Sequence, residues 1–137
     1  MMTEIPRGKE VRPVEDKIKD LIRQRRPIEA EAKILRSCYN GNTRKVDSAK
    51  AERVNTLDEQ IALIDGWLLL LNEDEAYVVK RHLVDGIDWP RIAMEYKGIW
   101  GDDYAKSERT LKTYQKRAME KILRFAREQK SPPDFLQ

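Results

Sequence analysis

The sequence has little of the chemistry that catalysis and metal binding need. One of its 137 residues is a cysteine, Cys38, and one is a histidine, His82. A single thiol excludes an internal disulfide and a cysteine metal cluster, so Cys38 is expected to be a small buried residue in a reducing compartment. A lone histidine in a helix is far more often a packing or surface residue than a ligand or a general base. No phosphate-binding glycine loop or nucleophile motif accompanies the scattered carboxylates, so we expect no enzyme, no cofactor and no metal site.

Glycine, proline and long apolar runs are also scarce. The chain has 6 glycines and 6 prolines, whereas 37% of its residues are charged and 40% are hydrophobic. This composition, with few β-branched runs, predicts an all-α protein with one modest core. No stretch approaches the roughly 18 apolar residues that span a bilayer, and the charged start lacks the apolar run of a signal peptide. We therefore expect a cytoplasmic protein with no membrane partner.

The first half of the chain predicts helices joined by a turn. Residues 1–13 hold two prolines and a glycine without apolar periodicity, so we expect a disordered arm. Apolar residues then recur at helical spacing, first at Val14, Ile18, Leu21, Ile28, Ala32, Leu35 and Tyr39 and, after the turn NGNT, at Val54, Leu57, Ile61, Ile64, Leu68 and Leu71. Pro27 lies inside the first series, where it either kinks one helix or separates two. Residues 14–71 are therefore predicted to form a helical hairpin, either closed on itself or paired with a second copy as a homodimer.

The middle of the chain carries the signals of two short helices. Asn72, with Glu75 three residues later, predicts an N-cap and a capping box, and Gly86 supplies a left-handed residue that ends the first helix. Asp88 predicts the cap of the second helix, which should end where a loop over residues 97–106 begins. The side chains expected to face inward are Ala76, Val79, Leu83, Ile92, Ala93 and Tyr96.

A strongly basic helix is predicted after this loop. Ser107 is expected to cap it, and residues 106–127 contain eight basic side chains against two acidic ones. A helical wheel turns Leu111, Tyr114, Ala118 and Ile122 inward, with Phe125 close by, and places Arg109, Lys112, Thr113 and Lys116 roughly opposite. Three helices in this order predict a helix-turn-helix whose last helix suits a DNA major groove. The alternative is a solvated charged face on a helical bundle.

Two segments carry a resemblance to a known family: LNEDEAYVVKRHLVDGIDWPRIAMEY and SERTLKTYQKRAMEKI. Together they span about residues 71–123, and they resemble region four of bacterial sigma factors. More closely, they are similar to phage-encoded sigma-like regulators of the ArpU and late-transcription-activator type. The residues that match the recognition-helix pattern are Ser107, Arg109, Thr110, Ala118 and Lys121. The resemblance implies that residues 72–128 form a helix-turn-helix DNA-binding domain with a long C-terminal recognition helix, followed by a tail over 129–137.

The same resemblance implies roles for individual residues. It places Arg109, Lys112, Thr113 and Lys116 at the major groove and makes Arg117, Lys106 and Arg91 the first candidates for contact with phosphates. The loop over residues 97–106 is longer than the tight turn of the sigma pattern. Its Trp100 and Tyr104 are expected either to cover the core or to contact DNA or a partner protein.

The function expected from these features is sequence-specific DNA binding by a transcriptional regulator, encoded by a phage or prophage and acting at promoters with RNA polymerase. Its partner would be double-stranded DNA. One alternative is a DNA-packaging recognition subunit of the small-terminase kind, which also joins a helix-turn-helix to helices for oligomerisation. Another is a helical interaction module that binds an acidic protein and never touches DNA.

Overall fold

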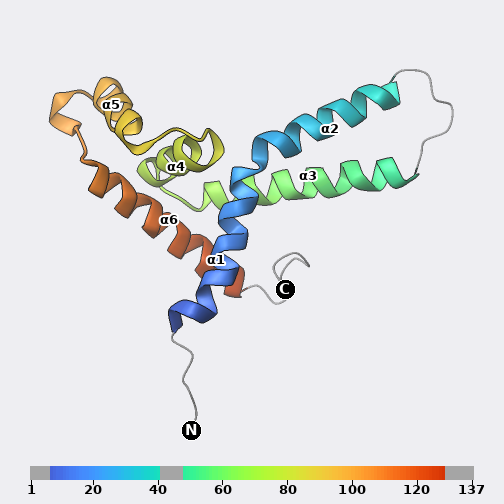
Figure 1. Cartoon of the computed structure of the whole chain (residues 1–137), viewed down its shortest axis with the longest axis horizontal. Coiled ribbons are helices and arrows are strands. Elements are labelled where there is room, and N and C mark those ends of the chain that lie inside the picture. The colour runs from blue at the N-terminus through green and yellow to red at the C-terminus, as the bar shows by residue number, and fades with distance from the viewer. Residues whose placement is uncertain (1–6, 41–47, 129–137) are drawn as a thin grey trace, which may run out of the picture.

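Over residues 7–40 and 48–128, which the computed structural model describes, the chain forms helices and no strand (Figure 1). Side chains are described for residues 14–38, 48–99, 101–103 and 105–128. The elements are α1 (Arg7–Arg23), α2 (Arg25–Asn40), α3 (Ser48–Leu69), α4 (Glu73–Val79), the π-helical turn η1 (Lys80–Val84), α5 (Trp89–Trp100), the 3₁₀ turn η2 (Asp102–Tyr104) and α6 (Glu108–Glu128). The predicted all-α class is confirmed. Within the described part, no helix combines the length and the apolar character that a membrane crossing requires.

Helix α1 begins earlier than the apolar pattern indicates. It starts at Arg7, inside the stretch that the sequence predicts to be a disordered arm. That prediction is therefore wrong for residues 7–13, and residues 1–6 lie outside the described part. An apolar pattern marks only those turns of a helix that bury one face. A polar first turn of a helix is therefore not detected by it.

Pro27 lies at the start of a second helix. Helix α1 ends at Arg23 and α2 begins at Arg25, so the proline occupies the first turn of α2, where N–H groups have no partner inside the helix. In one continuous helix the residue at position 27 would have to donate to the carbonyl of Arg23, and proline has no N–H to do so. The chain therefore forms two helices here, and they run in different directions (Figure 1).

Helices α2 and α3 form an antiparallel hairpin that extends away from the other helices (Figure 1). Ile28 of α2 and Leu57 and Ile64 of α3 are buried along their contact. Arg25 also crosses it, with its Nε 2.9 Å from Oδ1 of Asp65. A partly exposed ion pair contributes at most about 1 kcal/mol, so the apolar contact supplies most of the stability of the hairpin.

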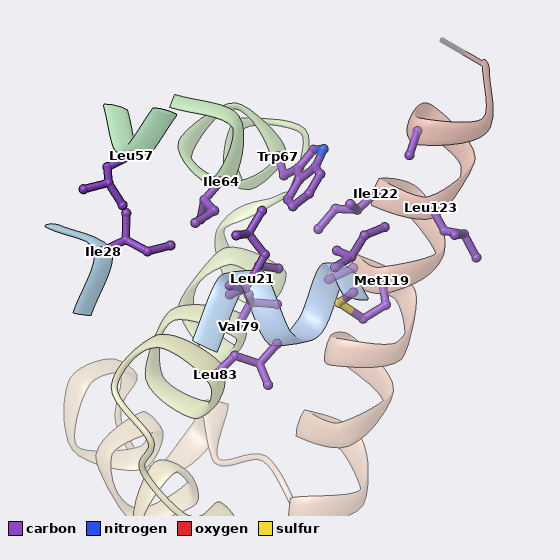
Figure 2. Close-up of a cluster of buried hydrophobic side chains, with 14 of the residues drawn as sticks. Leu21, Ile28, Leu57, Ile64, Trp67, Val79, Leu83, Met119, Ile122 and Leu123 are labelled. Atoms are coloured by element: carbon purple, nitrogen blue, oxygen red, sulfur yellow. The ribbon is translucent and has the colours of Figure 1, made fainter. Parts of the chain in front are cut away.

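The main core lies where α1 crosses α6 and the base of the hairpin (Figure 2). Its members come from six elements and include Ile18 and Ile22 of α1, Ile28 of α2, Trp67 of α3, Val79 of α4, Leu83 of η1, and Met119 and Ile122 of α6. Ile22, Trp67 and Met119 lie outside the predicted apolar stripes. A single stripe describes a helix with one neighbour, whereas these helices pack against two or more.

Two side chains lie in other environments than expected. Phe125 is 43% exposed, although the wheel turned it inward. Leu123 and Ala126 are buried in its place, beside Met119 and Ile122, because this part of the helix packs against α1. Cys38, expected to be buried, is exposed near the end of α2.

The caps of α4 and α5 form as the sequence predicts. Asn72 accepts a hydrogen bond from the Glu75 N–H at 2.8 Å, and the Glu75 carboxylate accepts one from the Asn72 N–H at 3.1 Å. Gly86 has a φ of 69°, the left-handed conformation that ends the preceding helix. Asp88 accepts from the backbone N–H of Arg91 at 3.1 Å and so caps α5.

The segment between α5 and α6 is shorter than the predicted loop. Helix α5 continues to Trp100, so the expected end near Lys97 is wrong. The turn comes at Gly101, whose φ is 88°, and η2 follows at once. Gly98, the other glycine of this stretch, is helical, so it gives no stop signal. The side chains of Trp100 and Tyr104 are outside the described part, and so is any role for them.

Candidate nucleic-acid interface

The start of α6 is held by a cap and by a small apolar cluster. Ser107 Oγ accepts from the backbone N–H of Thr110 at 3.2 Å, as the sequence predicts. Leu111, in the first turn, is fully buried against Val78, Ile92 and Tyr96. This second cluster is separate from the main core and joins α4, α5 and α6. The first turns of α6 are therefore fixed on one side and face solvent on the other.

The solvent side of these turns carries the residues predicted to meet the major groove. Arg109, Lys112, Thr113, Lys116 and Arg117 are all exposed. None of the four cations among them has an ion-pair partner within the described residues. Thr113 donates its hydroxyl proton to the carbonyl of Arg109 at 2.9 Å, which leaves its oxygen lone pairs to accept. The result is a surface of unpaired positive charge with one hydroxyl among the cations.

The arginines of the hairpin are arranged differently. Each arginine described in α2 and α3 pairs with a carboxylate: Arg25 with Asp65 and Glu29, Arg26 with Asp85, Arg36 with Asp58, and Arg53 with Glu31. The arginines of α6, at positions 109, 117, 124 and 127, have no such partner in the described chain. A solvated face usually mixes charges of both signs, whereas α6 presents cations that an anionic partner could neutralise.

One basic residue of α6 has a structural role. Lys121 Nζ lies 2.6 Å from Oε1 of Glu75, whose side chain is 3% exposed. The same carboxylate completes the capping box of α4. Lys121 therefore links α6 to the start of α4 and is removed from the set of free cations.

Lys106 and Arg91, the other two predicted phosphate contacts, differ from the α6 residues. Lys106 lies just before the Ser107 cap and is half-buried. Arg91 is in the first turn of α5, with a side chain that is 69% exposed and a Nε 3.8 Å from Oε1 of Glu95. Five of the seven predicted residues thus share one face of α6, a sixth precedes that helix directly, and Arg91 is engaged with an acid of its own helix.

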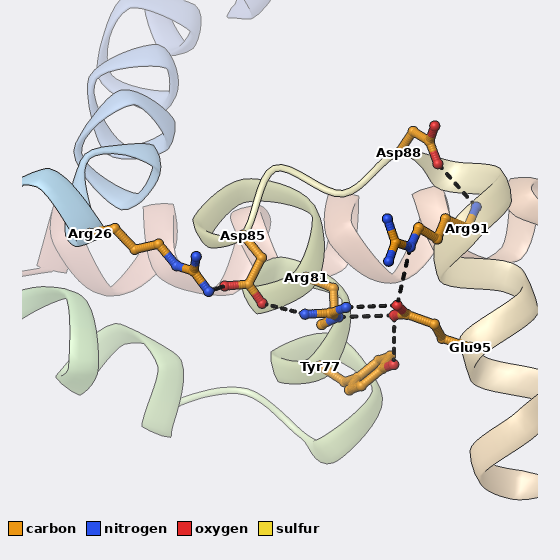
Figure 3. Close-up of polar contacts among 7 residues, drawn as sticks. All are labelled: Arg26, Tyr77, Arg81, Asp85, Asp88, Arg91 and Glu95. Carbon is orange, nitrogen blue, oxygen red and sulfur yellow. Dashed lines mark hydrogen bonds and ion pairs between the residues drawn. The ribbon is translucent and has the colours of Figure 1, made fainter.

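A polar network holds α5 against η1 and reaches α2 (Figure 3). Arg81 donates from Nε and Nη2 to both oxygens of Glu95, at 2.9 and 2.7 Å, and from Nη1 to Asp85 at 2.7 Å. Asp85 also accepts from Arg26 at 2.6 Å, and Glu95 accepts from Tyr77 at 3.3 Å. The bidentate bonds from Arg81 lower the pKa of Glu95 and raise that of Arg81. Such bonds fix the angle between their elements.

Sequence reasoning did not find this network. The spacing of four between Arg81 and Asp85 is a signal for a pair within one helix, and it could have been noticed. The bond from Arg81 to Glu95 joins two elements that are separated by a turn. No local sequence pattern predicts it.

His82 joins three elements as a packing residue. Its ring stacks on Trp89 with centroids 3.9 Å apart, and its Nδ1 lies 2.7 Å from Oε1 of Gln115 on α6. Burial is the main cause of a pKa held below the ordinary value, and the positive charges of Arg23, Lys19 and Lys112 lower it further. The imidazole thus lies in a positive field that comes from both α1 and α6.

Comparison of the chain with protein-family models, with curated proteins and with solved structures finds no match in any of the three. The functional proposal therefore rests on the side chains described above.

Proposed function

We propose that this chain binds double-stranded DNA through the N-terminal half of α6 and acts as a sequence-specific regulator of transcription. The observation that carries the proposal is the contrast in charge pairing. Among the described residues, the arginines of α2 and α3 are paired with carboxylates, whereas the cations of α6 are exposed and, apart from Lys121, have no ion-pair partner. Duplex DNA, with a negative charge about every 1.7 Å along its axis, is a partner that fits a row of such cations.

The elements around α6 support a helix-turn-helix reading. The capped α4 with η1, the short capped α5 and the capped α6 follow one another with brief connections. In that motif the N-terminal residues of the second helix reach base edges and the first helix crosses the backbone. We therefore propose α5 as the first helix and α6 as the recognition helix, with Leu111 packing α6 against α5 and the Arg81 network holding α5 against η1.

Each residue then has a proposed role. Arg109, Lys112 and Lys116 would lie in the major groove, where a cation can donate to the O6 and N7 acceptors of guanine and also neutralise a phosphate at the edge of the groove. Thr113 would offer its methyl group to thymine or accept from a base amino group. Phosphate contacts would come from Arg117, Lys106 and Arg91, and Arg91 would exchange its distant partner Glu95 for a phosphate.

The wider setting follows from the resemblance to region four of sigma factors. We propose that the protein acts at phage or prophage promoters together with RNA polymerase. The α2–α3 hairpin, which extends away from the DNA-binding part, is the proposed surface for a homodimer.

The test is duplex binding by fluorescence anisotropy across a salt series. The charge variant is Lys112→Gln/Lys116→Gln, and Arg124→Gln/Arg127→Gln removes the same charge from the C-terminal half of α6. We expect the wild type to bind with a steep salt slope and the first variant to lose about 1 to 2 units of slope, since each neutralised phosphate contributes about 0.9. The second variant should lose less. Equal binding by wild type and the first variant would show that this face is only solvated surface.

A packaging subunit of the small-terminase kind is the second candidate, and the projecting hairpin is the feature that favours it. Such a subunit would assemble many copies, whereas a regulator should be a monomer or dimer. Light scattering after size-exclusion chromatography separates the two. A closed ring of many copies would favour packaging over regulation.

A further inference from the structure

We propose that the DNA-binding surface continues from α6 onto α1, where Lys19 and Arg23 bind a phosphate of the duplex backbone. The inference rests on the proposed function, because it adds a second contact region to the same partner. It also gives α1 a functional role that no sequence pattern assigned to it.

The packing of α1 brings these two cations to the edge of α6. Ile18 and Ile22 of α1 are fully buried in the same cluster as Met119 of α6. Lys19 and Arg23 follow these two residues directly in the sequence and are one helical turn apart. They therefore share the side of α1 that borders its buried face.

Lys112 approaches this place from α6. It precedes Met119 by seven residues, two turns of helix, so both project on the same side of α6. Because Met119 packs with α1 in the main core, Lys112 lies on the α1 side of the exposed face. Lys112 thus connects the proposed groove-reading residues with the cations of α1.

The surroundings of His82 support a common location for Lys19, Arg23 and Lys112. Its neighbour Leu83 is buried in the cluster that contains Ile22. His82 itself lies 2.7 Å from Gln115 of α6, so this imidazole is situated between α1 and α6. The positive charges of Arg23, Lys19 and Lys112 all lower its pKa, in agreement with cations from both helices on this side of the protein.

The present partners of the two α1 cations are weak competitors. Lys19 pairs with Glu15 at 3.4 Å and Arg23 pairs with Asp20 at 3.1 Å, both within one turn of the same helix. Their side chains are 27% and 53% exposed. Pairs of this kind add little and are screened by salt, so a phosphate next to Lys112 can replace them without a rearrangement of the core.

The hairpin offers a matched control. Lys33 and Arg36 of α2 are also one lysine and one arginine, and both are exposed and paired with carboxylates. They lie on the projecting hairpin, away from α6 (Figure 1). The variants Lys19→Gln/Arg23→Gln and Lys33→Gln/Arg36→Gln therefore remove the same charge from two different places.

The experiment measures the affinity of the full chain for a mixed-sequence duplex, with wild type, both of these variants and Lys112→Gln/Lys116→Gln. For Lys19→Gln/Arg23→Gln we expect a salt slope shallower by about 1 unit, the share of one phosphate, and an affinity at least about fivefold weaker at low salt. The hairpin variant, whose oligomeric state is checked against wild type by light scattering because the hairpin is the proposed dimer surface, should bind within about twofold of wild type. Thermal unfolding by circular dichroism checks that all variants are folded.

The outcomes separate this inference from the proposed function. If Lys112→Gln/Lys116→Gln weakens binding but Lys19→Gln/Arg23→Gln matches the hairpin variant, the contact on α1 is refuted and the α6 proposal stands. If the wild type does not bind duplex, or if all variants bind alike, both proposals fail. A duplex shortened from either end gives a second readout, because a truncation that removes the α1 contact should weaken wild type and leave Lys19→Gln/Arg23→Gln unchanged.

Discussion

Lys121 of α6 and the buried Glu75 of α4 join two helices that are far apart in the sequence, with Nζ 2.6 Å from Oε1. Glu75 also accepts the backbone N–H of Asn72, so one carboxylate closes a helix cap and anchors α6. The pair divides the basic residues of α6 into two groups. Lys121 stabilises the fold, whereas the exposed lysines at the start of the helix are free to bind a ligand.

Replacing Glu75 or Lys121 should therefore reduce stability. We expect Glu75→Ala to lower the free energy of unfolding by about 3 kcal/mol, since it removes the carboxylate half of the capping box and leaves the lysine unpaired. Lys121→Ala should cost roughly 2 kcal/mol, because the carboxylate keeps its bond to Asn72 but loses its counter-charge. Urea unfolding followed by circular dichroism measures both. Lys116→Ala, on the exposed face of the same helix, is the control and should change stability by no more than about 0.5 kcal/mol.

Lys116→Ala and Lys121→Ala should have the opposite order of effects on DNA binding from the order they have on stability. Lys116→Ala is expected to reduce the salt slope by about 1 unit, and Lys121→Ala to leave it unchanged at temperatures where both proteins are folded. A loss of slope with Lys121→Ala equal to that of Lys116→Ala would argue that charge anywhere on α6 serves equally well.

His82 should make the fold less stable in mild acid. Burial and the cations around it hold its folded-state pKa below the ordinary value of 6.5, so between these two values the unfolded chain binds more protons than the folded chain. The free energy of unfolding should therefore fall as pH decreases through 6.5 and stop falling, for this group, below the folded-state pKa. His82→Gln removes the titration and should flatten this part of the curve, as measured by urea unfolding at a series of pH values.

Glu95 acts in a lower pH range. Its folded-state pKa is held below 4.5, chiefly by the bonds from Arg81, so its contribution is present above 4.5 and is lost as pH falls through the folded-state value. Glu95→Gln should therefore flatten the stability curve below pH 4.5 and not near 6.5. If His82→Gln and Glu95→Gln altered the same part of the curve, the assignment of the two titrations would be wrong.

Two glycines should respond to alanine in opposite directions. Gly86 has a φ of 69°, and an alanine there should cost about 1 kcal/mol because its Cβ is unfavourable in the left-handed region. Gly98 lies inside α5 and has nothing within 4 Å of an added Cβ, so alanine should stabilise by roughly 0.5 to 1 kcal/mol. Thermal or urea unfolding of the two single variants tests the pair, and destabilisation by Gly98→Ala would contradict the observed helix through residues 97–100.

The elements that the sequence predicted well depend on neighbouring residues. The caps at Asn72, Asp88 and Ser107 form because a side-chain oxygen accepts from an N–H three residues further along, whatever the rest of the chain does. The exposed face of Arg109 and Lys116 is also a local property, since it follows from helical periodicity.

What the sequence missed depends on contacts between distant elements. Ile22, Trp67 and Met119 are buried because α1 crosses the base of the hairpin and α6, and nothing near these residues reveals that crossing. The bidentate bond between Arg81 and Glu95 forms only after α5 has docked on η1. The convergence of α1 cations beside α6 has the same origin, so this part of the candidate site could not be predicted from the charge pattern.

The most direct test of the α6 proposal is an amide chemical-shift titration of the ¹⁵N-labelled chain with duplex DNA. The proposal predicts that the largest shifts fall on residues 107–117, that smaller ones fall around Lys19 and Arg23, and that α2 and α3 change little. Shifts confined to the α2–α3 hairpin, or no shifts on 107–117 at saturating duplex, would contradict the assignment of α6 as the DNA-reading helix.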